Sequence, residues 1–564
     1  MRTHFSKLCF CLFFLFLFQY GQAQLDKASK AVDEVFSEWS NTNSPGCAIA
    51  VIKDGEIIHK KGYGMADLEH DVPIRPSSVF YIGSVSKQFV AACMLLLDEQ
   101  GKIDLDEDVR TYIPEFPDYG HKISIRNLIH HTSGVRDNLT LWELAGRSHL
   151  EEIPEEEIFD MICRQKELNF EPGTKYMYSN SCYFLMSIIV ERVSGLSLRE
   201  YADKHIFTPL GMRHSIFGDD NRRIIKNRAF AYGKNPDGSF NSMLMRFDLV
   251  GSGGLYSTVE DLFLWDQNLY NNKIGTRGQA FIQDMLTNGK FKDGSPVNYA
   301  FALVNGTYKG LQTISHSGAL GGYRAVFVQF PEQQFSVIIL SNLEVFQPQG
   351  LAHKVADIYL SDQLQVNEKK IKKKKAEPRI IKLSEKHLAA LEGQFWNSDI
   401  GFPLTVNLKN DTLRYYDVEW GERILMPTGM HQFLLSGMEN EVSIHFYPTS
   451  KDHPRQLAIA FNGKEVARAD HFEVKPVTKK ELMKLAGSYY SAELDTRYQI
   501  KLEKEQLWLK LKNQGWSPMK RIKEDLYTQA KTGQFNFVFG KGGEIEGFSL
   551  NAGRVRNLKF SKVE

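Results

Sequence analysis

The stretch YIGSVSKQFVAACMLLL at residues 81–97 decides the fold, because it joins a polar turn to a long apolar segment. Its apolar side chains recur at helical spacing and predict a buried helix over residues 84–99, with one stripe formed by Phe89, Cys93, Leu96 and Leu97. Ser84 and Lys87 begin this helix and share one face of its first turn. A serine hydroxyl needs an adjacent base to become a nucleophile, and burial lowers the pKa of a lysine so that it can act as that base. The helix start would also place a backbone N–H beside a developing oxyanion.

Two further short motifs follow along the chain, Tyr178-Ser179-Asn180 and His316-Ser317-Gly318. Each motif is common by itself, since the same patterns occur in SPMK at 517–520 and YNN at 270–272. Ser84 could equally be a helix-capping serine and Lys87 a solvated lysine. Context favours the chemical interpretation, because the second SxxK lies among β-type sequence and its Pro518 would break a continuing helix.

Strand-like sequence stands near both ends of residues 24–362, and helical sequence stands between. Near the start, Asp54-Gly55 separates two apolar runs, which is a strong signal of a hairpin. The other elements that we expect are a helix over 26–40, strands over 299–304, 325–330 and 335–340, and a closing helix over 351–360. Together they predict an α+β domain over residues 24–362, in which an antiparallel sheet flanked by helices closes late around a helical insertion.

The composition changes at residues 363–383, where the run KKIKKKK (369–375) has no apolar periodicity and predicts a solvated basic linker. Beyond it, LAALEGQF at 388–395 matches LMKLAGSY at 482–489. Period-two segments follow each copy, so we expect β repeats over 384–475 and 476–564. These repeats would form two similar antiparallel barrels or one larger barrel with two similar halves.

The first 23 residues predict a cleaved export signal. Arg2 and Lys7 precede an apolar run at residues 8–18, and small residues follow at 21–23. The apolar run is too short to cross the hydrocarbon core of a membrane. We therefore expect a secreted or periplasmic protein with no stable membrane span.

Charge and cysteine usage exclude other classes of function. The 564 residues carry 69 basic and 68 acidic side chains, a net charge of +1, which gives no electrostatic footprint for nucleic acid. No CxxC pair occurs, so the paired ligand spacing of a zinc site is absent and we expect no metal site. We also expect no cofactor. The cysteines that follow the predicted signal lie in apolar contexts and predict buried thiols: Cys47, Cys93, Cys163 and Cys182. A small molecule or a peptide is the expected partner, as substrate.

Taken together, the three motifs and their flanks resemble the serine β-lactamases and penicillin-binding proteins, in particular the class C β-lactamase-like branch. The supporting flanks are LIHHTSGV at 128–135, FEPG at 170–173, PLGM at 209–212 and GGLYST at 253–258. The repeat region resembles, more loosely, the lipocalin-like barrels found in bacterial D-aminopeptidases.

The resemblance implies a role for each motif residue. Ser84 would be the acylated nucleophile, Lys87 would share its proton, and Tyr178 would act as general base and then as acid to the leaving group. Asn180 would hydrogen-bond the acyl amide of the substrate and Lys87. The remaining positions would line the substrate site (His316, Gly318) and, through their backbone N–H groups, form the oxyanion hole (Ser84, Ala319).

His316 stands where β-lactamases of this branch usually carry lysine, and histidine is nearly neutral at pH 7. Efficient β-lactam hydrolysis is therefore not expected. The sequence predicts instead an exported serine hydrolase that cleaves amide or ester bonds in D-amino-acid peptides, peptidoglycan fragments or small esters through an acyl-enzyme on Ser84. A non-catalytic cell-wall or peptide-binding protein and a true β-lactamase are the alternatives.

Overall fold

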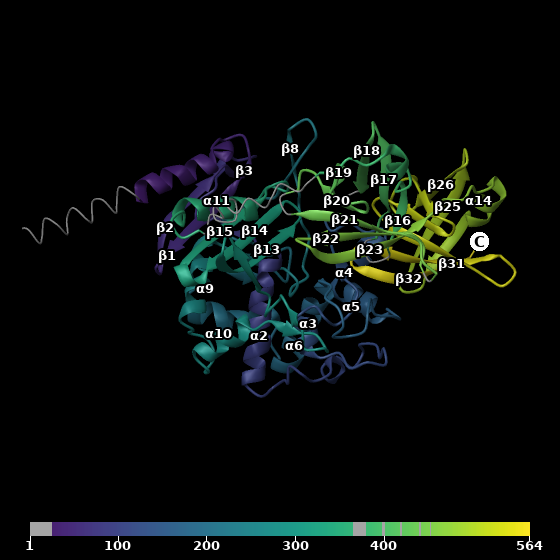
Figure 1. Cartoon of the computed structure of the whole chain (residues 1–564). Coiled ribbons are helices and arrows are strands. Elements are labelled where there is room, and N and C mark those ends of the chain that lie inside the picture. The colour runs from purple at the N-terminus through teal and green to yellow at the C-terminus, as the bar shows by residue number, and fades with distance from the viewer. Residues whose placement is uncertain are drawn as a thin grey trace, which may run out of the picture. The chain divides into compact units, whose positions relative to one another are not determined.

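The structure is a computed structural model that describes residues 25–364, 380–397, 401–417, 420–438, 441–451 and 453–563 (Figure 1). The predicted export signal and most of the predicted basic linker lie outside the described residues. The chain divides into two compact units. The first comprises residues up to 366 together with Arg554–Arg556, and the second comprises the remainder.

The first unit is built on a six-stranded antiparallel sheet that pairs strands from both ends of its sequence. β1 (Cys47–Lys53) and β2 (Glu56–Tyr63) form the predicted hairpin, and both turn residues, Asp54 and Gly55, have positive φ (52° and 82°). The order is β12-β13-β14-β15-β1-β2, with the late strands spanning Val304–Tyr308, Leu311–Leu320, Tyr323–Phe330 and Phe335–Ser341. Because β1 pairs with β15 as well as β2, the sheet closes late, as the sequence predicts.

Helices cover both faces of this sheet. On one face, the helix over residues 25–35 and α11 (Pro348–Tyr359) bury side chains such as Val32 and Val355 in one core with β1, β14 and β15. On the other face, α9 (Val259–Tyr270) contacts β1 and β15. Deeper in the helical insertion, α2 (Lys87–Glu99) packs against α6 (Asn180–Ser194).

The other helices of the insertion are short: α3 (Ile125–Ile129), α4 (Asn138–Leu144), α5 (Glu155–Cys163), α7 (Leu198–Ala202), α8 (Thr208–Leu210) and α10 (Gln279–Leu286). Short strands join them: β3 (Met65–Asp67), β4 (Val72–Pro73), β5 (Phe80–Tyr81), β6 (Ile216–Phe217), β7 (Tyr232–Lys234), β8 (Phe240–Ser242), β9 (Leu255–Ser257), β10 (Gly289–Lys290) and β11 (Pro296–Val297).

The sequence-based assignment of the late strands was partly wrong. The expected strand over 299–304 is a turn, in which the Ala300 N–H donates to the Leu303 carbonyl oxygen and Ala302 has a φ of 58°, so β12 begins at Val304. β13 was not predicted at all. Its serines and Gly318 interrupt the apolar alternation by which a strand is recognised.

The second unit contains two antiparallel β structures, and each follows a short helix. After α13 (Glu385–Ala389), eight strands form a closed barrel: β16 (Gly393–Trp396), β17 (Leu404–Lys409), β18 (Thr412–Asp417), β19 (Gly421–Pro427), β20 (Gln432–Leu435), β21 (Val442–Tyr447), β22 (Gln456–Phe461) and β23 (Lys464–Phe472). After α14 (Lys479–Leu485), nine strands form a sheet: β24 (Gly487–Ser491), β25 (Thr496–Glu503), β26 (Gln506–Lys510), β27 (Ser517–Pro518), β28 (Lys520–Lys523), β29 (Leu526–Gln529), β30 (Gly533–Phe539), β31 (Ile545–Ala552) and β32 (Val555–Lys562).

This second sheet is nearly closed into a barrel, because its two edge strands, β27 and β28, are separated in sequence by Met519 alone. The repeated glycines of the sequence, Gly393 and Gly487, each begin the first strand of one barrel. The repeat therefore correctly predicted small antiparallel barrels.

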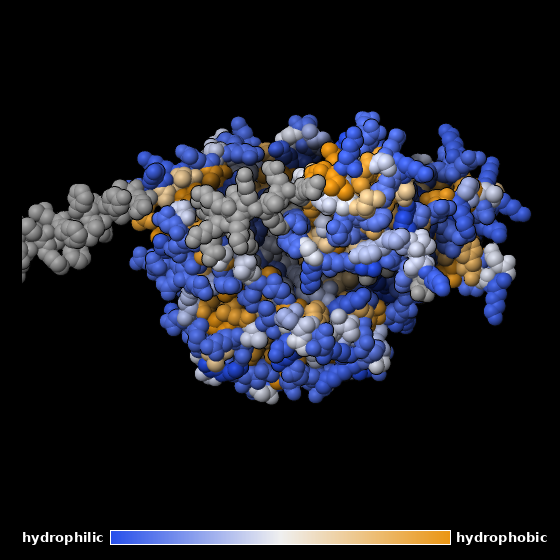
Figure 2. Space-filling view, in the orientation of Figure 1, coloured by the Kyte–Doolittle hydropathy of each residue, from blue (hydrophilic) through white to orange (hydrophobic). Residues whose placement is uncertain are grey.

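No single helix among the described residues is both long and apolar enough to cross a membrane, and one pair, Asn180–Ser194 with Leu198–Leu210, reaches the required length only across a 76° bend. On the face seen in Figure 2, hydrophilic side chains predominate, and apolar side chains gather in a few separate patches between them.

A buried carboxyl group ties α9 to the sheet. One oxygen of Asp266 accepts hydrogen bonds from Gln329 Nε2 (2.9 Å) and Ser336 Oγ (2.6 Å), and the other accepts one from Gln267 Nε2 (2.8 Å). The side chain is fully buried, and this burial raises the pKa of Asp266 from 3.8 to about 6. Between pH 4 and pH 6 the folded state therefore holds a proton that the unfolded chain has released.

Because the folded-state pKa is raised, the stability linked to this proton is present at acidic pH and is lost as the pH rises through about 6. Asp266→Asn keeps the shape and removes the buried charge. We expect the variant to be more stable than the wild type at pH 8, by on the order of 2–3 kcal/mol, and the difference to shrink at pH 4.5. Urea unfolding followed by tryptophan fluorescence measures this. Asp362→Asn, at an exposed position, is the control, and a variant less stable than the wild type at pH 8 would contradict the argument.

Candidate active site

Ser84 and Lys87 lie where a tight turn leads into α2. Gly83–Ser86 form a 3-10 turn, and Lys87 is the first residue of α2, so the expectation that the helix begins at Ser84 was wrong by three residues. The Ser86 hydroxyl fixes the turn, donating to the Gly83 carbonyl oxygen (2.6 Å) and accepting from the Leu255 N–H (3.2 Å). The turn still keeps both side chains on one face, with Lys87 Nζ 3.0 Å from Ser84 Oγ.

The Lys87 amine is completely buried and surrounded by oxygen atoms. Besides Ser84 Oγ, it contacts Asn180 Oδ1 at 2.9 Å and the Ser252 carbonyl oxygen. Burial lowers the pKa of Lys87 well below its usual value of 10.5, although the nearby Asp137 carboxylate opposes this shift. A neutral amine can donate its two hydrogens to Asn180 and Ser252 while its lone pair faces the Ser84 hydroxyl. This arrangement suits a base that removes the serine proton.

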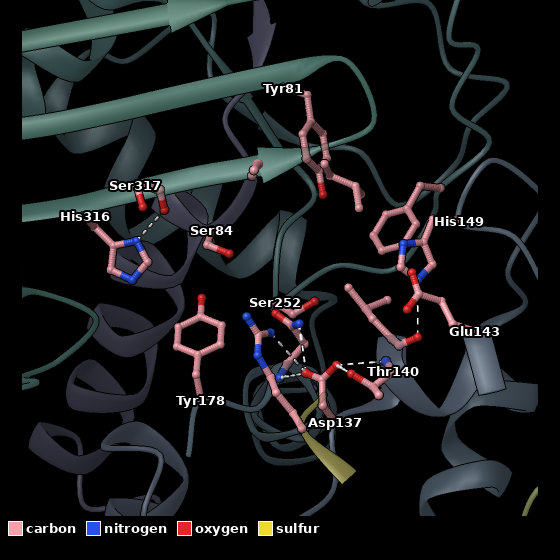
Figure 3. Close-up of a pocket in the computed structure, with 17 residues that line it drawn as sticks. Tyr81, Ser84, Asp137, Thr140, Glu143, His149, Tyr178, Ser252, His316 and Ser317 are labelled. Atoms are coloured by element: carbon pink, nitrogen blue, oxygen red, sulfur yellow. Dashed lines mark hydrogen bonds and ion pairs between the residues drawn. The ribbon is translucent and has the colours of Figure 1, made fainter. Parts of the chain in front are cut away.

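The Tyr178 hydroxyl points toward Ser84 (Figure 3), and the ring centroids of Tyr178 and His316 lie 6.4 Å apart. The hydroxyl is buried and makes no hydrogen bond of standard geometry to any described residue. Burial raises the pKa of Tyr178 well above its usual value of 10, and the neighbouring Ser84 hydroxyl only partly opposes the rise. In the free protein Tyr178 is therefore a neutral phenol, placed to donate a proton.

A histidine holds the Tyr178 segment in place. The rings of His131 and Tyr178 lie 4.2 Å apart between centroids, and His131 Nδ1 accepts the Ser179 N–H at 3.2 Å. His131 has a φ of 56° in the turn that ends α3, as the sequence predicts for residues 130–134. The FEPG stretch also forms the expected turn, which the Thr174 N–H closes by donating to the Glu171 carbonyl oxygen (3.1 Å), and the Gly173 N–H donates to the Thr132 carbonyl oxygen (2.8 Å).

Asp137, which the sequence analysis did not single out, positions Asn180. One carboxylate oxygen accepts from both the backbone N–H (2.6 Å) and Nδ2 (2.9 Å) of Asn180. The other oxygen caps α4 by accepting from the backbone N–H (2.9 Å) and hydroxyl (3.0 Å) of Thr140. The carboxylate is 1% exposed. Because one oxygen bonds the first turn of α6 and the other the first turn of α4, it joins these two helices at the site. It fixes Asn180 Oδ1 toward Lys87.

His316 lies on β13 and is neutral over the physiological range. Burial, aided by nearby Lys87, lowers its pKa to about 4. Assigned from its partners, the tautomer carries the proton on Nδ1, which donates to the Ser317 carbonyl oxygen (2.7 Å), while Nε2 accepts from the hydroxyl of Tyr299 (2.9 Å). Tyr299 was also missed by sequence reasoning, because a single tyrosine outside a motif carries no signal.

The two predicted oxyanion-hole residues lie on adjacent backbone segments. A Cβ on Gly318 would collide with the Ile82 carbonyl oxygen and lie 3.0 Å from the Ser84 nitrogen. A Cβ on Gly83 would lie 2.6 Å from the Ala319 nitrogen. Only glycine at both positions allows β13 to approach the nucleophile turn so closely. This approach brings the Ser84 and Ala319 N–H groups together.

These residues share one pocket of about 600 Å³, whose lining includes Ser84, Tyr178, Asn180, His316 and Ala319 (Figure 3). Lys87 and Gly318 do not line the pocket themselves but adjoin Ser84, with Lys87 Nζ 3.0 Å from Ser84 Oγ and a Cβ on Gly318 3.0 Å from the Ser84 nitrogen. The second SxxK and YxN patterns lie elsewhere, with Ser517 in β27 and Tyr270 at the end of α9. The structure therefore brings the predicted site residues together and leaves the duplicate motifs apart.

Within the described residues, no group of three or more His, Cys, Asp or Glu side chains is arranged to hold a metal ion. The four described cysteines are free thiols; three are buried and Cys163 is half-buried.

The chain is similar to known proteins over its first unit. A family model described as Beta-lactamase matches residues 28–359. "Penicillin-binding protein 4*" of Bacillus subtilis (strain 168) is 30% identical over 314 residues, which are 52% of this chain and 68% of that protein. A D-aminopeptidase of Gluconobacter oxydans (strain 621H) is 28% identical over 299 residues, 53% of this chain and 56% of that protein, so the match spans little more than half of this relative.

Among solved structures, an octameric penicillin-binding protein homologue from Pyrococcus abyssi has a TM-score of 0.53 at 22% identity, covering 79% of this chain and 99% of that chain. This likeness is one of fold.

The protonation of Lys87 predicts a pH dependence. Only the neutral amine accepts the serine proton, so kcat/KM for an ester should rise with pH and level off below pH 10.5. The Asp137 carboxylate raises the pKa of Lys87, so Asp137→Asn should move the rising limb of the profile to lower pH. The variant should also lower the plateau value of kcat/KM, because Asn180 loses the carboxylate that holds its side chain in place. A pH–rate profile measures both effects. Asp108→Asn removes a capping carboxylate away from the pocket and is the matched control; an unmoved limb in Asp137→Asn would refute the assignment.

Proposed function

The chain belongs to the β-lactamase family of serine hydrolases, and we propose that it is an exported member that forms an acyl-enzyme on Ser84 and cleaves amide or ester bonds. The observation that carries this proposal is the fully buried Lys87 amine, 3.0 Å from Ser84 Oγ. Burying a lysine without a direct carboxylate contact is costly unless the amine is neutral. A neutral amine at this distance is a base for the serine. Export is supported by the N-terminal sequence alone.

Acylation starts when Ser84 Oγ attacks the substrate carbonyl carbon while its proton passes to Lys87 Nζ. The negative charge on the carbonyl oxygen is stabilised by the N–H groups of Ser84 and Ala319. Tyr178 then donates its phenolic proton to the leaving amine or alcohol, and Lys87, whose Nζ lies 4.9 Å from the Tyr178 ring centroid, returns a proton to the phenol. The carbon–leaving-group bond breaks, and an ester on Ser84 remains.

Deacylation reverses these transfers with water as the nucleophile. Water gives its proton to the Tyr178–Lys87 pair and its oxygen to the acyl carbon, and Ser84 regains a proton as the acid is released. The raised pKa of Tyr178 and the lowered pKa of Lys87 in the free protein support Lys87 as the group that first accepts the serine proton.

The substrates that we propose are D-amino-acid peptides, peptidoglycan fragments or small esters. Relatives named penicillin-binding protein and D-aminopeptidase support peptide-type substrates. The neutral His316 argues against efficient β-lactam turnover, because the pocket then lacks a fixed cation at the position where β-lactamases of this branch carry lysine.

The test is hydrolysis of an activated ester, which needs few specificity contacts. Ser84→Ala should lower kcat/KM by at least about 10³-fold, since it removes the nucleophile. Mass spectrometry of quenched wild-type protein should show the acyl group on the peptide that contains Ser84. Ser517→Ala, in the second SxxK pattern, should leave both results unchanged. Turnover retained in Ser84→Ala would exclude the proposed mechanism.

A further inference from the structure

The pocket has two chemically different ends on either side of Ser84. Figure 3 shows Tyr178 and His316 on one side of the serine, and Glu143 and His149 on the other. In the proposed mechanism Tyr178 protonates the leaving group, so the leaving group occupies the Tyr178 side. The acyl portion of the substrate must then extend toward Thr140 and Glu143, both on α4.

The ionisable side chains that line the pocket differ in how far neighbouring groups already occupy them. Asp137 is buried, holds Asn180 and caps α4, and the guanidinium of Arg554, a residue of the first unit, lies 3.7 Å from its Oδ2. His316 is neutral. Glu143 differs, because its side chain is 61% exposed, and His149 Nε2 lies 3.5 Å from its Oε1.

We propose that Glu143 binds a positively charged amino group on the acyl portion of the substrate, and that it is the specificity-determining residue for α-amino amides and esters. This inference rests on the acyl-enzyme function proposed above. A carboxylate that keeps its acceptor sites open at the rim of a concave pocket attracts an ammonium group more strongly than one on a flat surface. His149 Nε2 lies beside this carboxylate and is also 3.2 Å from the Leu139 carbonyl oxygen.

The pocket also offers apolar surface. Leu139, Phe247 and Leu320 are among the residues that line it. An α-amino acyl group carries an ammonium and a side chain on one carbon, so it can place the ammonium against Glu143 and an apolar side chain against these residues. The substrate class that fits is therefore the amide or ester of an apolar α-amino acid with a free amino group.

The test compares two esters that differ only in the amino group: D-leucine methyl ester and methyl 4-methylpentanoate. The wild type should favour the amino ester in kcat/KM by about tenfold or more at low ionic strength, and the preference should weaken as salt is added. Glu143→Gln should abolish most of this preference, and Glu143→Asp should keep part of it. Glu156→Gln, an exposed glutamate of α5 that does not line the pocket, should preserve the wild-type ratio.

A charge reversal gives an independent check. Glu143→Lys should favour monomethyl succinate, which carries a carboxylate on its acyl portion, over methyl 4-methylpentanoate. An unchanged ratio in Glu143→Gln, or a wild type with no preference, would overturn the inference about Glu143. Loss of the proposed function is distinguished by Ser84→Ala: if neither ester is hydrolysed in a Ser84-dependent manner, the acyl-enzyme mechanism itself fails.

Discussion

The burial of the Lys87 amine is the constraint on which the rest of the site depends. A lysine in this position is useful only when it is neutral, and it is neutral only while water is kept out and its hydrogens have partners. The partners come from three separate segments: Ser84 in the turn before α2, Asn180 at the start of α6, and the Ser252 carbonyl oxygen. A displacement of any one of them would change both the protonation of the amine and its distance from the nucleophile.

Much of the first unit can be understood as the means of holding these segments together. Asp137 caps α4 and also accepts hydrogen bonds from Asn180, so one carboxylate fixes the starts of two helices. His131 packs against Tyr178 from a turn with positive φ. Gly83 and Gly318 let β13 lie against the nucleophile turn, and β13 is held in register by β14 in a sheet that closes only when β1 pairs with β15. The site therefore depends on the pairing of parts that are far apart in sequence.

The sequence was informative where chemistry imposes a fixed local spacing. Ser84 and Lys87 are three residues apart because both must lie on one turn, and Tyr178 and Asn180 stand at the start of a helix. Short fixed spacings of this kind can be recognised in a single sequence. The Asp-Gly hairpin and the repeated barrels were likewise predictable from local turn chemistry and period-two patterns. Asp137 and Tyr299 could not be found this way, because each acts through a contact with a segment distant in the chain. β13 was missed because the residues that serve the site, His316, Ser317 and Gly318, replace the apolar alternation of a strand.

The most direct test of this account is a neutron crystal structure of the wild-type protein at pH 7, which locates the hydrogens on Lys87 directly. The account predicts two deuterons on Nζ, directed at Asn180 Oδ1 and the Ser252 carbonyl oxygen, and the Ser84 hydroxyl deuteron directed at the lysine nitrogen. Three deuterons on Nζ would show a charged ammonium in the resting protein. The central claim, that Lys87 is the base for Ser84, would then be contradicted.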